Sequence, residues 1–160
     1  MMEILQQGNK KLKRKSKRVS KIDSSIKQLC EDLVETMISN EGAGIAAPQC
    51  GILKRIIVVL VNDTPKVMIN PEILFHSNET ECNDEGCLSI PGTFIQKERY
   101  SSVTIKYRNV EGHPHLETHT GLPTRIIQHE IDHLNGVLMT DDVPPDELAQ
   151  HPPTGAPDAL

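Results

Sequence analysis

The stretch between positions 122 and 135 constrains the fold of this chain more than any other segment. Its apolar side chains recur at helical spacing: Ile126, Ile127, Ile131 and Leu134. Pro123 is tolerated in the first turn of a helix, and Gly136 is a common stop just past a helix end. With so many apolar neighbours the helix is expected to be buried, so the rest of the 160-residue chain has to wrap around it.

This predicted helix carries two histidines four residues apart in the run His129-Glu130-Ile131-Asp132-His133. Four residues advance a helix by slightly more than one turn, so both imidazoles project from one face. Glu130 lies beside the point they share, which suits two nitrogen ligands and a carboxylate placed for proton transfer. A surface helix with two exposed histidines is the alternative. The apolar flanks argue against it, because buried imidazoles need partners and a metal would supply one.

A catalytic metal centre of this kind usually has three protein ligands and an open position. Downstream of the helix the candidates are carboxylates in a proline-rich stretch: Asp141, Asp142, Asp146 and Glu147. The upstream run Glu85-Gly86-Cys87-Leu88-Ser89 offers a better third ligand, because a cysteine thiolate binds such metals well and Gly86 lets the backbone come close.

A glycine-rich loop of small residues, 42–49, forms a third element. Small side chains allow a substrate backbone to approach, and the amide of Gln49 suits a developing oxyanion. Taken alone, this loop could also be a tight turn with a satisfied surface glutamine.

Periodicity in the remaining chain predicts an α+β fold, with short, mostly antiparallel strands around a central metal-binding helix. Residues 24–40 have the pattern of an N-terminal amphipathic helix capped at Asp23, Ser24 or Ser25, with Cys30 on its apolar stripe as a small core residue. Strands are expected at 56–61, at 67–69 with a stop at Asn70-Pro71, and in a hairpin of 103–107 with 115–120.

Composition and length favour one domain over residues 1–143 and a flexible proline-rich tail over 144–160. With a net charge of −5, the chain as a whole is not a nucleic-acid binder by charge alone, and no direct DNA binding is expected. No apolar run approaches membrane-spanning length. No signal peptide is evident, and the four cysteines match no disulfide or zinc-finger pattern. Reduced thiols in a cytosolic setting are therefore expected.

Residues 10–21 are strongly basic, and this basic segment has two interpretations. It could be an arm that touches RNA or a ribosome. A solvated surface segment is the interpretation we favour from sequence, because no aromatic side chains interleave for base stacking.

Three motifs, taken together and in this order, resemble the peptide deformylase family: Gly42-Ala43-Gly44-Ile45-Ala46-Ala47-Pro48-Gln49, Glu85-Gly86-Cys87-Leu88-Ser89 and Gln128-His129-Glu130-Ile131-Asp132-His133-Leu134. The resemblance covers about residues 1–142. It implies a hydrolase that removes the formyl group from the formyl-methionine of nascent polypeptides and releases formate. N-formylmethionyl nascent peptides are then the expected partners, in the cytoplasm of a bacterium or, alternatively, in an organelle.

The resemblance also implies a role for individual residues. The ligands of one divalent metal would be Cys87, His129 and His133; the family's metal is usually ferrous iron, and zinc, nickel or cobalt can occupy the site. Glu130 would move the proton, while the Gln49 amide and the Leu88 backbone N–H would stabilise the oxyanion. Substrate-binding positions would be Gly44, Ile45, Glu85 and Leu122. Arg99 would pair with Glu85 and support the cysteine loop, unless the pair is exposed and worth little.

Two departures from the family pattern stand out. Pro123-Thr124-Arg125 replaces a more apolar approach to the metal helix, and a C-terminal helix that docks some relatives on the ribosome is missing. The basic segment 10–21 is a candidate substitute for that contact. Two rivals remain at this point: a general zinc endopeptidase, which the cysteine motif argues against, and a non-catalytic relative that keeps the fold as a binding module.

Overall fold

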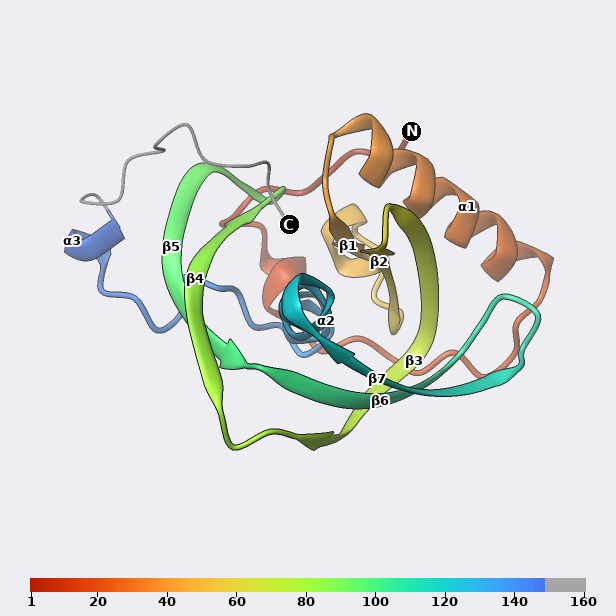
Figure 1. The fold of residues 1–160 in the computed structure, drawn as a ribbon. Coiled ribbons are helices and arrows are strands. Elements are labelled where there is room, and N and C mark those ends of the chain that lie inside the picture. The colour runs from red at the N-terminus through yellow and green to blue at the C-terminus, as the bar shows by residue number, and fades with distance from the viewer. Residues whose placement is uncertain (149–160) are drawn as a thin grey trace.

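In the computed structural model, which describes residues 1–148, strands surround a central helix α2 (Gly121–Leu134) on several sides (Figure 1). A longer helix α1 (Ser24–Ser39) packs outside them. The remaining elements are η1 (Lys10–Lys13), β1 (Gly44–Ala46), η2 (Ala47–Cys50), β2 (Ile56–Val61), β3 (Thr64–His76), β4 (Thr80–Cys87), β5 (Ile90–Tyr100), β6 (Ser102–Arg108), β7 (Pro114–Thr120) and α3 (Pro145–Leu148).

The strands form two antiparallel sheets. One sheet has five strands in the order β1-β2-β3-β6-β7, and the other is the β4–β5 hairpin. The α+β prediction of antiparallel strands around a central helix is confirmed. No helix among residues 1–148 is long and apolar enough to cross a membrane.

Strand β2 shows why its sequence is apolar throughout. Ile57 and Val59 pack with α2, whereas Ile56 and Val58 pack with α1. Successive side chains of a strand point to opposite faces, so a strand covered by a helix on each face needs apolar residues at every position. The same alternation in β1 turns the Ile45 side chain toward α1 and Ala46 toward α2.

Both predicted helices are present, and α1 begins where the sequence indicates. The Asp23 side chain accepts a hydrogen bond from the Ile26 backbone N–H at 3.0 Å and caps its first turn. Cys30 is 1% exposed, and burial raises the pKa of its thiol to about 11. Its predicted role as a packed core residue is confirmed.

Strand β3 corrects the prediction that a strand ends at Asn70-Pro71. It continues to His76 because the chain bulges there: Asn70 has a φ of 53°, and the pairing with β6 shifts between Ile69 and Glu72. The bulge removes the need for a ladder donor at Pro71. The Asn70 side chain compensates by bonding both the N–H and the carbonyl of Val19, each at 2.8 Å.

Segments predicted as loops also gain regular structure. The 42–49 loop contains β1 and η2, and the cysteine motif lies in the β4–β5 hairpin with Leu88 and Ser89 at its turn. The predicted flexible tail begins with the short helix α3, and its residues 149–160 lie outside the described part of the chain.

Candidate active site

Helix α2 and the end of β4 bring three potential metal ligands together. Ligand atoms of Cys87, His129 and His133 all lie within 4.8 Å of one another, and all three residues are buried. Cys87 Sγ is 3.4 Å from His133 Nε2. The helix supplies both histidines from one face, as predicted, and the hairpin turn that follows Cys87 directs the thiol against them.

The polar atoms in this site are left without partners from the described residues. His129 Nε2, His133 Nδ1 and both carboxylate oxygens of Glu130 are buried and make no hydrogen bond. Such atoms are costly unless something else satisfies them. A divalent ion fits this donor set, because thiolate and imidazole are ligands that such metals prefer. The residues present therefore fit a metal centre with Cys87, His129 and His133 as its ligands.

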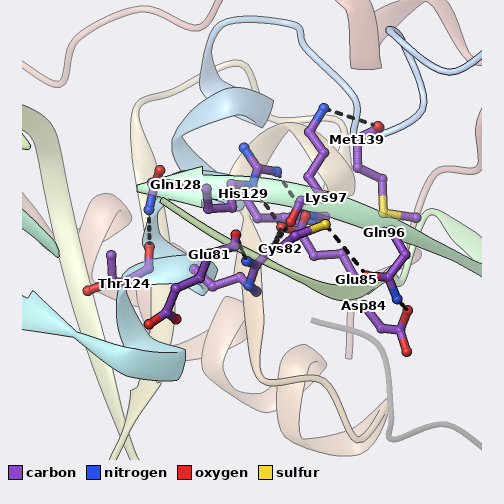
Figure 2. A network of polar contacts seen from close by, with 12 residues as sticks. Glu81, Cys82, Asp84, Glu85, Gln96, Lys97, Thr124, Gln128, His129 and Met139 are labelled. Atoms are coloured by element: carbon purple, nitrogen blue, oxygen red, sulfur yellow. Dashed lines mark hydrogen bonds and ion pairs between the residues drawn. The ribbon is translucent and has the colours of Figure 1, made fainter. Parts of the chain in front are cut away.

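Glu85 of β4 orients the first histidine. Its Oε1 accepts a hydrogen bond from His129 Nδ1 at 2.9 Å, which leaves Nε2 as the lone-pair nitrogen on the ligand side (Figure 2). Burial alone would raise the pKa of Glu85. Hydrogen bonds from Arg99 and His129 outweigh burial and hold that pKa well below its usual range. Glu85 thus remains a carboxylate that fixes the tautomer of His129.

The Glu85–Arg99 pair predicted from sequence is present and buried, so the exposed-pair alternative does not apply. Arg99 donates to both carboxylate oxygens, from Nε at 2.7 Å and from Nη2 at 2.8 Å. Its Nη1 donates to Asp132 Oδ2 of α2 at 2.6 Å. Arg99 therefore ties the β4–β5 hairpin to the metal helix, and the middle of the His-Glu-Ile-Asp-His run gains a structural partner that the sequence did not identify.

Arg125 is a second cation on Glu85 that the sequence analysis missed. Its Nη1 donates to Glu85 Oε2 at 2.7 Å and to the Lys97 carbonyl at 2.8 Å, and its Nη2 donates to the Glu81 carbonyl at 2.7 Å. It lies one helical turn before His129, on the same face of α2, and that spacing is the signal that could have revealed it. One guanidinium thus joins the helix to both strands of the hairpin.

We expect Arg125→Met to weaken metal retention by about 10-fold, the lower end of the typical cost of losing a direct partner of a metal ligand, because Arg125 supports Glu85, which in turn orients His129. Arg125→Lys should restore little, since an ammonium cannot reproduce the guanidinium's fixed fork. Competition with a chelator measures the affinity, and thermal melting of the metal-free protein measures folding separately.

Arg55→Met is the matched control. Arg55 also bonds α2, through the Leu134 carbonyl at 3.0 Å, but among the described residues it makes no hydrogen bond or ion pair with Glu85. Both variants should melt at lower temperature, and only Arg125→Met should bind metal more weakly. Equal metal affinities in the two variants would mean that Arg125 serves folding alone.

Glu130 is the buried carboxylate beside the ligands. It is fully buried, and burial raises the pKa of Glu130 to about 7. A carboxylate with a pKa near neutrality can both take up and release a proton. It lies against β1: a Cβ built on Gly44 would be 2.6 Å from Glu130 Oε2 and 2.5 Å from Ile126 Cγ2. Glycine at position 44 is therefore required for the strand to pass so close to the carboxylate.

Gln49 is held with its amide nitrogen toward the ligands. Its Oε1 accepts from the Ala46 backbone N–H at 2.9 Å, which fixes the orientation of the amide. Nε2 then lies 3.6 Å from Cys87 Sγ and 3.2 Å from Ser89 Oγ. Ser89, which is fully buried, is a further partner that the sequence did not single out. The arrangement presents a fixed donor beside the site.

The predicted substrate positions lie around this site in different ways. Gly44 and Ile45 belong to β1, one of the two edge strands of the five-stranded sheet, and the Ile45 side chain points into the core. Leu122 is exposed at the start of α2, and Leu88 is half-buried. The carboxylate of Glu85 is occupied by protein partners, so a substrate contact at this residue would have to use its backbone.

A buried helix with a His-Glu-x-x-His pattern, a thiol as the third ligand and a carboxylate beside them defines the class of metal-dependent hydrolases. Comparison with known proteins narrows the class. The family model for polypeptide deformylase matches residues 1–149. The chain belongs to the peptide deformylase family.

Individual relatives agree with the family match. A peptide deformylase of Thermotoga neapolitana is 46% identical over 138 residues, which cover 86% of this chain and 84% of the relative. The crystal structure of peptide deformylase from Thermotoga maritima has a TM-score of 0.87 at 43% identity and covers 91% of this chain and 99% of its own. A class I type b enzyme from Acinetobacter baumannii, in a structure with Met-Ala-Ser bound, has a TM-score of 0.85 at 36% identity and covers 89% of this chain and 98% of its own.

Proposed function

We propose that the buried site of α2 and β4 performs the reaction of this family, the hydrolysis of the formyl amide at the N-terminal formyl-methionine of nascent polypeptides, with release of formate. The family membership supports the reaction. The observation that carries the proposal is the convergence of Cys87, His129 and His133 on one point, with Glu130 buried beside them. The A. baumannii relative bound to Met-Ala-Ser supports a peptide with N-terminal methionine as the ligand class.

The proposed resident metal is ferrous iron, held by Cys87, His129 and His133. One thiolate and two imidazoles also suit zinc, nickel or cobalt, so these ions are expected to occupy the same ligands. When bound, the metal supplies Lewis acidity, which lowers the pKa of a water molecule and polarises the formyl carbonyl.

The chain's own residues supply the remaining steps. Glu130 takes a proton from the attacking water and delivers it to the leaving amine, a role that suits its raised pKa. The oxygen of the formyl group receives hydrogen bonds from Gln49 Nε2 and the Leu88 backbone N–H. The close approach of Gly44 to Glu130 leaves little room at this point, which favours a formyl hydrogen over a larger acyl carbon.

The peptide is proposed to bind as an additional strand along β1. This strand pairs with β2 on one side only, so among the described residues no strand occupies its other edge, where an extended peptide could pair. The Ala46 N–H is not available to such a peptide, because it already bonds Gln49 Oε1. Gly44, Ile45 and Leu122 are the proposed contact positions, together with the backbone at Glu85.

The proposed setting is the cytoplasm of a bacterium, where formylated nascent chains are made; the Thermotoga relatives support a bacterial source. Ribosome contact is part of the proposal, with the basic segment 10–21 as the candidate contact.

Formate release from formyl-Met-Ala-Ser by protein purified without air, with metal analysis on the same sample, tests the function. Formate should appear in proportion to bound metal and cease when a chelator removes the metal. Acetyl-Met-Ala-Ser is the matched control and should not be hydrolysed. Metal-loaded protein that releases no formate would indicate a non-catalytic relative, and cleavage of an internal bond in the acetylated peptide would indicate an endopeptidase.

A further inference from the structure

The positive charge of this chain is concentrated along one path. The basic segment 10–21 holds eight of the seventeen Lys and Arg residues and no acidic residue, in a chain whose net charge is −5. Such segregation creates a local positive potential on an otherwise acidic molecule.

The backbone of the basic segment is fixed on the protein. The Leu12 side chain is fully buried. The backbone of Lys17 forms an isolated parallel β-bridge with that of Lys54, and the Arg55 N–H donates to the Lys17 carbonyl at 2.9 Å. Asn70 then holds Val19 through both backbone groups. The charges are therefore displayed on an ordered track, which lowers the entropic cost of binding an extended partner.

The basic segment borders a pocket of about 240 Å³, which Arg18 lines. Arg18 of the basic segment meets Lys106 and Arg108 of β6 and His115 of β7 there, with Asn70 and Tyr107 in the lining. The pocket exists because β3 bulges at Asn70, where the pairing with β6 is interrupted, and because Asn70 draws the basic segment against the bulge. Three segments distant in sequence thus converge on one cationic concavity.

The cations of the pocket are incompletely neutralised by the described residues. Within residues 1–148, neither Arg18 nor Arg108 takes part in an ion pair. Lys106 Nζ pairs with Glu72 Oε2 at 3.5 Å, and both side chains are exposed. His115 Nδ1 lies 3.6 Å from Glu117 Oε2, so a carboxylate also borders the pocket on this side. Arg55 is near enough that its pKa is lowered, first by burial and then by the charge of Arg18. A bound anion would reduce the repulsion between these neighbouring positive charges.

The shape and chemistry of the pocket favour a nucleic acid over a protein. A guanidinium group can donate two parallel hydrogen bonds to the oxygens of one phosphate. The His115 ring stacks on the Tyr107 ring, with the ring centroids 5.0 Å apart and the ring planes 5° apart. His115 stays partly exposed, so a base can stack beside the phosphate site. Large apolar anchors typical of protein interfaces are missing from this lining, because Ile69 is buried and Tyr107 is 5% exposed. The substrate is a nascent polypeptide, so RNA is the nucleic acid present where it is made.

We propose that the pocket of Arg18, Lys106, Arg108 and His115 binds a phosphate of an RNA strand whose backbone continues along the basic segment 10–21. The contact is to the sugar–phosphate backbone and one stacked base, and it carries no sequence preference.

Fluorescence anisotropy with a labelled single-stranded RNA of about ten nucleotides tests the proposal. Wild-type protein should bind with an affinity that falls steeply with salt. The double variant R18A/R108A should bind about tenfold more weakly or worse, and the slope of log Kd against log salt should fall by about 0.7, because the pocket contacts one phosphate of a single strand. Formate release from a short formyl peptide should be unchanged, since neither residue lies near the ligands.

The control variant K27A removes an exposed cation of α1 outside the pocket and the basic segment and should bind RNA like the wild type. An unaffected R18A/R108A variant, or an equal loss in K27A, would overturn the proposal. Displacement of the RNA by inorganic phosphate at the same total phosphate concentration would reveal a free-phosphate site instead. Equally tight binding of a polyglutamate peptide would reveal a surface for acidic proteins.

Discussion

Replacing Glu130 with glutamine is expected to lower kcat for formate release by about 10²- to 10⁴-fold while the protein keeps its metal. Glutamine has nearly the shape of glutamate, so the packing against Gly44 and Ile126 is preserved. It cannot accept a proton at neutral pH, so both proton transfers fail. Kinetics on formyl-Met-Ala-Ser with metal analysis of the same preparation give the measurement.

A second readout of Glu130→Gln uses the metal-free protein. Burial raises the pKa of Glu130 to about 7 from an ordinary value of 4.5, so the folded state holds a proton that the unfolded state gives up. The stability that comes with that proton is full below pH 4.5 and is lost as the pH rises through about 7. The metal-free variant should therefore melt at higher temperature than wild type above pH 7, and the difference should shrink toward pH 4.5.

Glu31→Gln in α1 is the matched control, because this exposed residue is remote from α2. It should change neither kcat nor the pH dependence of melting. A Glu130→Gln variant with wild-type kcat would remove Glu130 from the reaction, and one that loses its metal would assign the residue to metal binding.

Gln49→Ala should lower kcat by about 10²- to 10³-fold, the typical cost of removing one oxyanion donor. The donor is already oriented in the folded protein, because Ala46 N–H fixes the amide oxygen and so directs Nε2 toward the site. An interaction formed mainly in the transition state affects kcat more than KM.

The substitution also leaves the buried Ala46 N–H without its acceptor, so a lower melting temperature is expected. Gln28→Ala on the exposed face of α1 controls for the loss of an amide. A folded Gln49→Ala variant that retains more than about a tenth of wild-type kcat would exclude this amide as an oxyanion donor.

Hydrophobic periodicity predicted those elements whose side chains follow a simple pattern of burial. Helix α1 has a capped start at Asp23 and a single apolar stripe, and β2 is apolar at every position because both its faces are covered. Strand β4 has neither signal: Thr80 to Asp84 are exposed, so the residues carry no burial pattern for a sequence analysis to detect. The continuation of β3 past Pro71 depended on a bulge stabilised by Val19, fifty-one residues away.

The residues of the candidate site that lie in the three sequence motifs could be predicted from the sequence. His129, Glu130 and His133 follow from the helical period, and Cys87 and Gln49 follow from the two upstream motifs. Arg125 was missed because its partners, Glu85 and the carbonyls of Lys97 and Glu81, come from strands that the sequence did not indicate. Contacts between a helix and an unpredicted hairpin cannot be read from local pattern alone.

The ligands of the bound metal give the most direct test of the central claim, that Cys87, His129 and His133 hold it. X-ray absorption at the metal edge of the zinc-loaded protein should show one sulfur at about 2.3 Å and two nitrogens at about 2.0–2.1 Å. The sulfur shell should vanish in Cys87→Ser. A metal shell of nitrogen and oxygen alone in the wild type, or a sulfur shell that persists in Cys87→Ser, would contradict the assignment.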